Sequence, residues 1–249
     1  MPRRRWTTLR FAVVGDESVG TTIRQAGADV VSAVESADAV VAVGESALVD
    51  TALDESIDCP VVPVDCAMPW STPHRTLDDA VASILAGDRH VVDHPILSIS
   101  VAGDHAGRAL FDTMLATSEP AHISEYGVAH ARQGSAIRSD ADLLDDDTWL
   151  PVDGFRADGV VVATPLGSTG YARAAGGPVV GPDAGAAIVP VSPYATQTDT
   201  WVFQPPLRLT VERDDAPVSL VVDDGVVRDV PPFEPVVVTV DGSAKLLLE

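Results

Sequence analysis

The stretch 163–180, ATPLGSTGYARAAGGPVV, combines hydroxyl side chains with glycines over a few positions. It directly follows the apolar run 160–162, which indicates a buried strand. Hydroxyls can donate and accept hydrogen bonds, and glycines let a ligand approach the backbone closely. A connection between strands needs only one or two turn residues, so we interpret this stretch as a ligand-binding loop. Its candidate residues are Thr164, Gly167, Ser168, Thr169, Gly170 and Tyr171.

Polar residues also precede the apolar run. Arg156 and Asp158 belong to an Arg-x-Asp-Gly turn, and a small-residue segment ending in Gly176-Gly177-Pro178 follows the loop. A purely structural connection would need only one of these features. Together they favour a site for a small polar ligand over a structural role.

The segment Gly15–Thr22 is a second candidate, because it has the glycine spacing of a phosphate-binding loop after a strand. However, Thr21 replaces the lysine of that motif, and Asp16 and Glu17 would repel phosphate. We therefore expect an ordinary strand-to-helix turn there.

Patterns for other chemistries are weak. No GxSxG elbow occurs, although catalytic triad partners can be distant in sequence and a hydrolase stays open on that ground. Cys59 and Cys66 lack metal-ligand spacing and are expected to be small buried residues rather than a disulfide. His90 and His94 are expected on a strand, so no metal site is predicted.

The charge of the chain is strongly negative, since 37 Asp and Glu against 16 Lys and Arg give a net charge of −21. Such a surface repels nucleic acids and anionic membranes, so neither is expected as a partner. Molar salt screens this repulsion, because the Debye length there is about 3 Å. We therefore expect a protein of a halophile's cytoplasm.

The N-terminal segment has the basic residues Arg3–Arg5, as export signals do. Arg10 and Asp16 interrupt the apolar stretch that follows, so we expect a first strand behind a basic tag rather than a signal peptide. No run of eighteen uncharged apolar residues is present, and no membrane span is predicted.

Strand-like and helix-like segments alternate through residues 1–92, which predicts a small doubly wound α/β domain with a parallel sheet. Thr76 is expected to cap the last helix, and Gly87 to end it. The expected strands are 9–14, 39–43 and 59–64, and the expected helices are 18–26, 47–53 and 76–86.

Residues 93–249 lack helical periodicity and predict a mostly antiparallel β domain. Turns are expected at pairs such as Asp214-Asp215, and the acid-rich stretch 140–147 is expected to be a solvated loop. The expected strands are 96–101, 108–115, 160–163, 187–191, 207–212, 218–222 and 236–240.

The segment 154–181 resembles the NAD kinase family, whose binding segment has the pattern DGxxxxTPTGSTAYxxxAGGP. Leu166 replaces a threonine of the pattern, and Gly170 replaces an alanine. The resemblance implies an α/β domain followed by a β domain, the order expected above. The matching positions are Asp158-Gly159, Thr164-Pro165, Gly167-Ser168-Thr169, Tyr171 and Ala175-Gly176-Gly177-Pro178.

The resemblance assigns roles in binding NAD or NADP. It implies that Asp158 holds the nicotinamide end, that Arg156 meets a phosphate of NADP, and that Thr169, Gly170 and Tyr171 hold base groups. Ser118-Glu119 falls where the family has Asn followed by an acidic residue. The family also implies a homo-oligomer, a dimer or tetramer, that uses ATP or polyphosphate with Mg²⁺.

The resemblance is incomplete at the phosphate-donor loop. The family has Gly-Gly-Asp-Gly-Thr after a strand, where this chain has Val43-Gly44-Glu45-Ser46-Ala47. Glu45 is the candidate base and keeps a carboxylate one methylene further out, while Gly44 and Ser46 are the candidate phosphate contacts. A misplaced base can cost on the order of 100-fold in rate.

Two hypotheses of different classes follow. The first is an NAD kinase that phosphorylates the adenosine 2'-hydroxyl of NAD to give NADP. The second is a divergent haloarchaeal paralogue that binds NAD or NADP without phosphorylating it, as a sensor or a partner subunit. A related lipid kinase is a weaker third, because it needs the same glycine motif and no basic membrane-facing patch is present.

Overall fold

The computed structural model of the chain describes residues 9–68, 70–119, 122–132, 137, 139–213 and 215–248. The basic segment Arg3–Arg5 and Asp214 of an expected turn lie outside the described residues. None of the described helices is long and apolar enough to cross a membrane.

The chain divides into two compact units. One contains the described residues up to His94 together with those from Ser243 onward, and the other is Pro95–Gly242. The residues from Ser243 onward had been assigned to the second domain from the sequence. They belong with the first unit because Leu246 pairs in parallel with Val61 of its sheet.

The first unit alternates strands and helices around a parallel sheet of order β2-β1-β3-β4-β16, of which β16 supplies its last residues. Its elements are β1 (Arg10–Val14), η1 (Glu17–Val19), α1 (Gly20–Gln25), β2 (Asp29–Val30), η2 (Val34–Ser36), β3 (Ala39–Val43), α2 (Glu45–Leu53), β4 (Val61–Val64), η3 (His74–Thr76) and α3 (Leu77–Ala86).

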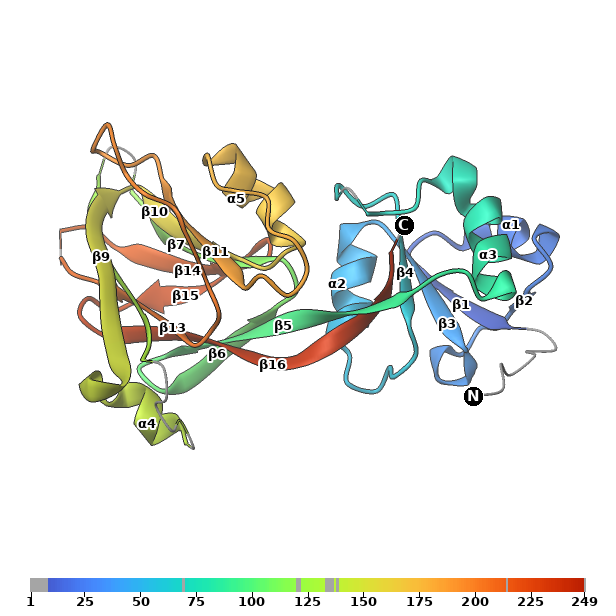
Figure 1. Cartoon of the computed structure of the whole chain (residues 1–249), viewed down its shortest axis with the longest axis horizontal. Coiled ribbons are helices and arrows are strands. Elements are labelled where there is room, and N and C mark those ends of the chain that lie inside the picture. The colour runs from blue at the N-terminus through green and yellow to red at the C-terminus, as the bar shows by residue number, and fades with distance from the viewer. Residues whose placement is uncertain are drawn as a thin grey trace. The chain divides into compact units, whose positions relative to one another are not determined.

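Helices cover both faces of this sheet (Figure 1). Ile23 of α1 and Leu77 of α3 pack in one core cluster with Phe11, Val41 and Val62 of the strands. The alternate strand residues face α2, because successive side chains of a strand point to opposite faces. The predicted doubly wound α/β domain is confirmed.

Details at the helix ends differ from the predictions. Gly87 ends α3 in the left-handed conformation with φ 77°, as expected. Thr76 makes no side-chain cap, since its hydroxyl donates to the carbonyl of Pro73, so the predicted helix cap at Thr76 is wrong. Helix α2 begins at Glu45 rather than Ala47, which places the candidate base in its first turn.

The second unit is built from antiparallel strands. Its elements are β5 (Val91–Val101, shared with the first unit), β6 (Asp104–Ala109), β7 (Asp112–Thr117), β8 (Ser124–Ala131), α4 (Asp140–Leu144), η4 (Asp146–Thr148), β9 (Trp149–Ala157), β10 (Gly159–Ala163), η5 (Gly167–Thr169), α5 (Tyr171–Ala174), β11 (Ala186–Val191), β12 (Trp201–Phe203), β13 (Leu207–Val211), β14 (Val218–Val222), β15 (Gly225–Val230) and β16 (Pro235–Leu247).

Two sheets of this unit share one apolar core. The first has the order β12-β11-β10-β7-β14-β15, and the second contains β16, β13, β8 and β9 with the β5–β6 hairpin. Val160 and Leu115 of the first sheet pack with Tyr126 and Leu209 of the second. Alternate residues of β10 face the opposite way, and Val161 packs with Ala172 of α5. The predicted antiparallel β domain is confirmed (Figure 1).

The strand expected at 108–115 is wrong, because the structure has two strands, β6 and β7, with a turn at Leu110 and Phe111. The backbone N–H groups of this turn donate to the carboxylate of Asp223 instead of a neighbouring strand. A side chain more than 100 residues away thus ends the ladder locally.

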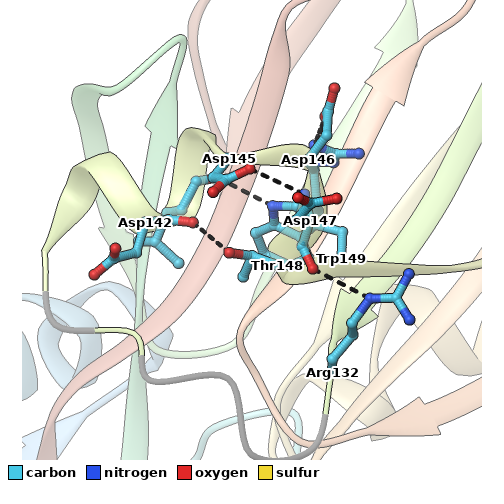
Figure 2. Close-up of polar contacts among 9 residues, drawn as sticks. Arg132, Asp142, Asp145, Asp146, Asp147, Thr148 and Trp149 are labelled. Atoms are coloured by element: carbon cyan, nitrogen blue, oxygen red, sulfur yellow. Dashed lines mark hydrogen bonds and ion pairs between the residues drawn. The ribbon is translucent and has the colours of Figure 1, made fainter.

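The acid-rich stretch is largely exposed, as predicted, but it forms the short elements α4 and η4 instead of a loop (Figure 2). Ser139 and Asp142 form a capping box at the start of α4. The hydroxyl of Thr148 donates to the carbonyl of Asp142, and Arg132 donates to that of Asp147. Buried Trp149 anchors the segment. Local side-chain bonds therefore give this acidic stretch its structure.

Candidate functional site

The hydroxyl- and glycine-rich loop leaves β10, a strand that is buried along its whole length. β10 lies between β7 and β11 in the six-stranded sheet, and Ala163 pairs with Asp112 of β7. The loop therefore starts from the interior of a rigid sheet, and only its far end can reach solvent.

The loop is anchored first by Thr164, which is fully buried. Its hydroxyl lies 2.8 Å from the carbonyl oxygen of Leu110 and 2.9 Å from that of Phe111. Its backbone N–H donates to the Phe111 carbonyl as well. A Cβ added to Gly167 would lie 2.0 Å from the same carbonyl oxygen, so only glycine fits there.

Ser168 forms the second anchor. This fully buried serine donates to the carbonyl of Pro165 at 2.7 Å and accepts from the backbone N–H of Val180 at 2.9 Å. Thr169 donates to the carbonyl of Leu166 and is only partly exposed. The hydroxyls predicted to face a ligand are therefore engaged in holding the loop.

The exposed part of the loop is short. Gly170 is exposed, and half of the Tyr171 surface is open to solvent at the start of α5. A Cβ at Gly170 would meet only the carbonyl oxygen of Gly167, at 3.5 Å. This tip presents an aromatic ring and open backbone on a fixed base, which suits a flat ligand such as a nucleotide base.

Two carboxylates that sequence reasoning missed lie at the base of the loop. Asp112 opens β7 opposite Ala163, so its side chain is on the sheet face that α5 covers. Burial, and secondly the charge of Asp223, raise the pKa of Asp112 to about 7. Burial also raises the pKa of Asp223, against three backbone N–H groups that favour its charged form. Acids with perturbed pKa values are enriched at functional sites.

The sequence carried little signal for this pair. Asp112 lies inside the expected strand 108–115, and Asp223 directly follows the expected strand 218–222. Only the pairing of β7 with β14, which joins residues 111 positions apart, brings them together.

The other predicted binding residues lie at the opposite end of β10. Asp158 donates its backbone N–H to Val191, and its carbonyl accepts from Thr117. The guanidinium of Arg156 lies 5.6 Å from the centre of the Tyr194 ring. At the same end, the hydroxyls of Ser118 and Ser219 lie 2.7 Å apart, and Glu119 contacts His122 at 3.3 Å.

The structure therefore sorts the predicted residues into two groups within this unit. Asp158 and Thr164 are separated by the length of β10, about 20 Å at a rise of about 3.3 Å per residue. The loop residues and Asp112 form one group, and the residues around Arg156 and Asp158 form the other.

The candidate donor loop belongs to the first unit. Gly44 precedes α2 with φ 86°, and its N–H donates to the carbonyl of Val64. Exposed Glu45 accepts from the N–H of Ala67 at 3.1 Å through Oε1, and Ser46 is also exposed. The first-turn amides of a helix lack intrahelical partners and can bind phosphate.

The position of this loop in the sheet also fits a ligand site. The connection after β1 leads to β2 on one side, and the connection after β3 leads to β4 on the other. Ligands bind outside the carboxyl ends of strands at such a reversal. The turn after β1 meets the same edge, and Asp16 closes it by accepting from the Ser18 N–H, as in an ordinary strand-to-helix turn.

Metal ligands are sparse. Among the described residues, no three His, Cys, Asp or Glu side chains lie close enough together to hold a metal ion. Cys59 and Cys66 are free thiols. A divalent ion would need ligands from a bound molecule, as Mg²⁺ does with nucleotide phosphates.

Solved structures of low sequence identity share this fold. Yeast NADH kinase in complex with NADH matches 100% of this chain and 88% of its own with a TM-score of 0.71 at 13% identity. An Archaeoglobus fulgidus NAD kinase in complex with ATP matches 96% of this chain and 93% of its own with a TM-score of 0.68 at 19% identity. The fold is that of the NAD and NADH kinases.

Sequence comparisons find similarity to NAD kinases. Residues 132–247 match the model of the ATP-NAD kinase C-terminal domain. The Methanopyrus kandleri NAD kinase is 32% identical over 60% of this chain and 48% of its own length. That of Methanosarcina mazei is 47% identical over 36% of this chain and 30% of its own. The matches thus span half or less of these relatives. Residues 132–247 are therefore similar to the C-terminal domain of the ATP-NAD kinases.

Proposed function

We propose that this protein is an NAD kinase, which transfers a phosphoryl group from ATP or polyphosphate to the adenosine 2'-hydroxyl of NAD and forms NADP. The observation that carries the proposal is the loop 164–171 of the second unit. Its buried hydroxyls hold a base from which Thr169, Gly170 and Tyr171 project. The similarity to NAD kinases supports the same activity.

The binding roles follow from the chemistry of the loop. The Tyr171 ring offers a face on which a base can stack, and the open backbone at Gly170 offers hydrogen bonds to the base edge. Asp112, whose carboxylate has no hydrogen-bond donor among the described residues, can accept from ribose hydroxyls. Thr164, Gly167 and Ser168 support the loop.

The second polar group keeps the roles expected from the resemblance. Arg156 can pair with a phosphate of NADP, and Asp158 can hold the nicotinamide end. Ser118 and Glu119 lie beside them. Arg156→Ala should therefore weaken binding of NADP more than binding of NAD, which titration calorimetry with both ligands would measure. Equal losses of affinity for NADP and NAD would contradict the phosphate-binding role of Arg156.

In the proposed reaction, the 2'-oxygen forms a bond to the transferred phosphorus as the bond between that phosphorus and the donor oxygen breaks. The proton of the 2'-hydroxyl passes to the carboxylate of Glu45. The amides at the start of α2, next to Gly44 and Ser46, contact the donor phosphates. A divalent metal such as Mg²⁺ would neutralise the charge of those phosphates when bound with them.

The proposal is tested by incubating purified protein with ATP, NAD and Mg²⁺ in about molar KCl and measuring NADP. Wild-type protein should form NADP, and Glu45→Gln should not, although glutamine can still accept from the Ala67 N–H. NAD binding without turnover in the wild type would instead identify a binding paralogue. Absence of both binding and turnover would reject both readings.

The cellular setting and assembly are also proposals. The net charge of −21 supports a cytoplasm with high salt, where screening reduces repulsion among carboxylates. The midpoint of thermal unfolding should therefore fall when KCl is lowered from about 2 M to 0.1 M. We further propose a homo-oligomer, a dimer or tetramer, which light scattering after size exclusion would reveal.

A further inference from the structure

The carboxylate of Asp223 connects strand β14 to the turn before β7. It accepts the backbone N–H of Leu110 at 3.1 Å, of Phe111 at 2.8 Å and of Asp112 at 3.1 Å. The N–H of Asp223 itself donates to the carbonyl of Asp112. One side chain thus gathers three consecutive peptide groups into a fixed turn.

The backbone of Asp223 is adapted to this task. Its φ of 50° lies in the left-handed region, which Asp and Asn tolerate better than most other residues. The neighbouring Asp224 is exposed and makes none of these contacts. Two adjacent residues of the same charge therefore have different environments, which provides a matched comparison.

The opposite side of the same turn holds the ligand-binding loop. The carbonyl oxygens of Leu110 and Phe111 lie 2.8 and 2.9 Å from the hydroxyl of Thr164. The Phe111 carbonyl also fixes the approach of Gly167, where a Cβ would lie 2.0 Å away. The backbone N–H groups of this turn donate to Asp223, and its carbonyl oxygens accept from Thr164.

From these contacts we infer that Asp223 is a positioning residue of the proposed NAD site, which acts through the turn 110–112 on the loop 164–171. The inference rests on the proposed function for its ligand, but the contacts it invokes are within the chain. Charged acceptors make stronger hydrogen bonds than neutral ones, and bonds in series polarise one another. Loss of the charge at Asp223 therefore loosens both Thr164 and Gly167.

Asp223 also affects the charge of Asp112. The charged groups that bear on this pair are the two carboxylates themselves and, beside Asp223, Asp224. Removing the charge of Asp223 should lower the pH at which Asp112 loses its proton. A residue with only a packing role would not move that pH.

The test compares Asp223→Asn with Asp224→Asn in the full chain, in about molar KCl. Hydrogen exchange followed by mass spectrometry should show at least about 10-fold faster exchange of peptides covering 164–171 in Asp223→Asn. The Asp224→Asn variant should match the wild type. Unchanged protection of that loop in a folded Asp223→Asn variant would overturn the inference, whether or not NAD binds.

A ligand readout separates this inference from the proposed function. If the wild type binds NAD, Asp223→Asn should raise KM for NAD by about 10-fold with little change in KM for ATP, and its pH profile should shift to lower pH. A change confined to kcat would contradict the positioning role. If the wild type does not bind NAD, the proposed function fails while the exchange result still decides the inference.

A second variant covers the case in which Asp223→Asn does not fold. Thr164→Val removes only the hydroxyl that donates to the carbonyls of Leu110 and Phe111, on the loop side of the turn. Its loop peptides should also exchange faster, and the double variant should be no worse than the more damaged single variant. Protection of the loop in Thr164→Val equal to that of the wild type would overturn the inference.

Discussion

Two glycine-containing loops follow buried strands in this chain, one in each unit, and they differ in how they are held. In the loop 164–171, two buried hydroxyls and a crowded glycine hold the backbone against the turn at Leu110 and Phe111 and against Val180. In the loop 44–46, the Cβ position of Gly44 is open, and Glu45 makes one side-chain bond, to Ala67. The first loop is fixed by its surroundings, and the second depends on helix α2.

Because the two loops are held differently, they should differ in how well they tolerate substitutions. A loop fixed by buried contacts loses its shape when any of those residues changes, so its motif must be kept as a whole. A loop at an exposed helix start tolerates other side chains as long as the helix amides remain. We infer that ligand binding and phosphoryl transfer respond differently to substitution in this protein.

The largest expected effect is on turnover at Glu45. Glu45→Ala should lower kcat by at least about 100-fold, because it removes the proposed base, while the Kd for NAD changes by less than about 3-fold. Steady-state kinetics and calorimetry measure the two quantities. Glu45→Gln is the control for the Ala67 contact, and wild-type turnover in it would exclude a base role.

The next effect is on the crowded glycine. Gly167→Ala should cost about 3 kcal/mol of stability and abolish NAD binding, because its Cβ would overlap the Phe111 carbonyl. Gly170→Ala is the matched control, since only the Gly167 oxygen lies near, at 3.5 Å. Urea denaturation of both variants measures the difference. Equal midpoints would contradict the fixed character of this loop.

A smaller effect is expected from the buried hydroxyl of Thr164. Thr164→Val keeps the shape but leaves two backbone carbonyls with fewer donors, which should cost about 1–3 kcal/mol. By contrast, Ser46→Ala in the other loop changes an exposed side chain and should alter stability by less than about 0.5 kcal/mol. Chemical denaturation measures the free energy of unfolding of both variants. Similar losses of stability in Thr164→Val and Ser46→Ala would contradict the difference between the two loops.

The pH dependence of stability gives the smallest effect. Since the pKa of Asp112 is raised from 3.8 to about 7, the folded protein retains a proton that the unfolded chain releases. This residue therefore makes stability fall as pH rises from about 4 to 7. Asp112→Asn should remove that decrease, so that its free energy of unfolding changes less between pH 4 and pH 8 than that of the wild type. Parallel curves for wild type and variant would contradict a buried carboxyl.

The sequence predicted the existence of the loop but not the direction of its side chains. Hydroxyls at Thr164 and Ser168 look alike in sequence whether they face a ligand or the protein. Only the fold shows that the turn before β7 lies beside Thr164 and that Val180 lies beside Ser168, so that both side chains are anchors. The pattern of small polar residues therefore predicted where the loop is, but not whether its hydroxyls face a ligand or the protein.

The fold was predictable where local signals suffice. Alternating strand and helix patterns gave the doubly wound unit, and Gly87 marked a helix end correctly. The long-range contact of Asp223 with Leu110, which breaks the expected strand, could not be predicted from local patterns. The helix of the acidic stretch begins at Ser139 and Asp142, which are three residues apart. The capping box has a local signal, Ser-x-x-Asp, that could have been recognised.

The central claim is that the tip of the loop 164–171 binds NAD. A crystal structure of the protein soaked with NAD in high salt tests it most directly. The account predicts the base of the dinucleotide against Tyr171 and Gly170, with a ribose near Asp112. A bound dinucleotide that contacts none of these three residues would contradict it.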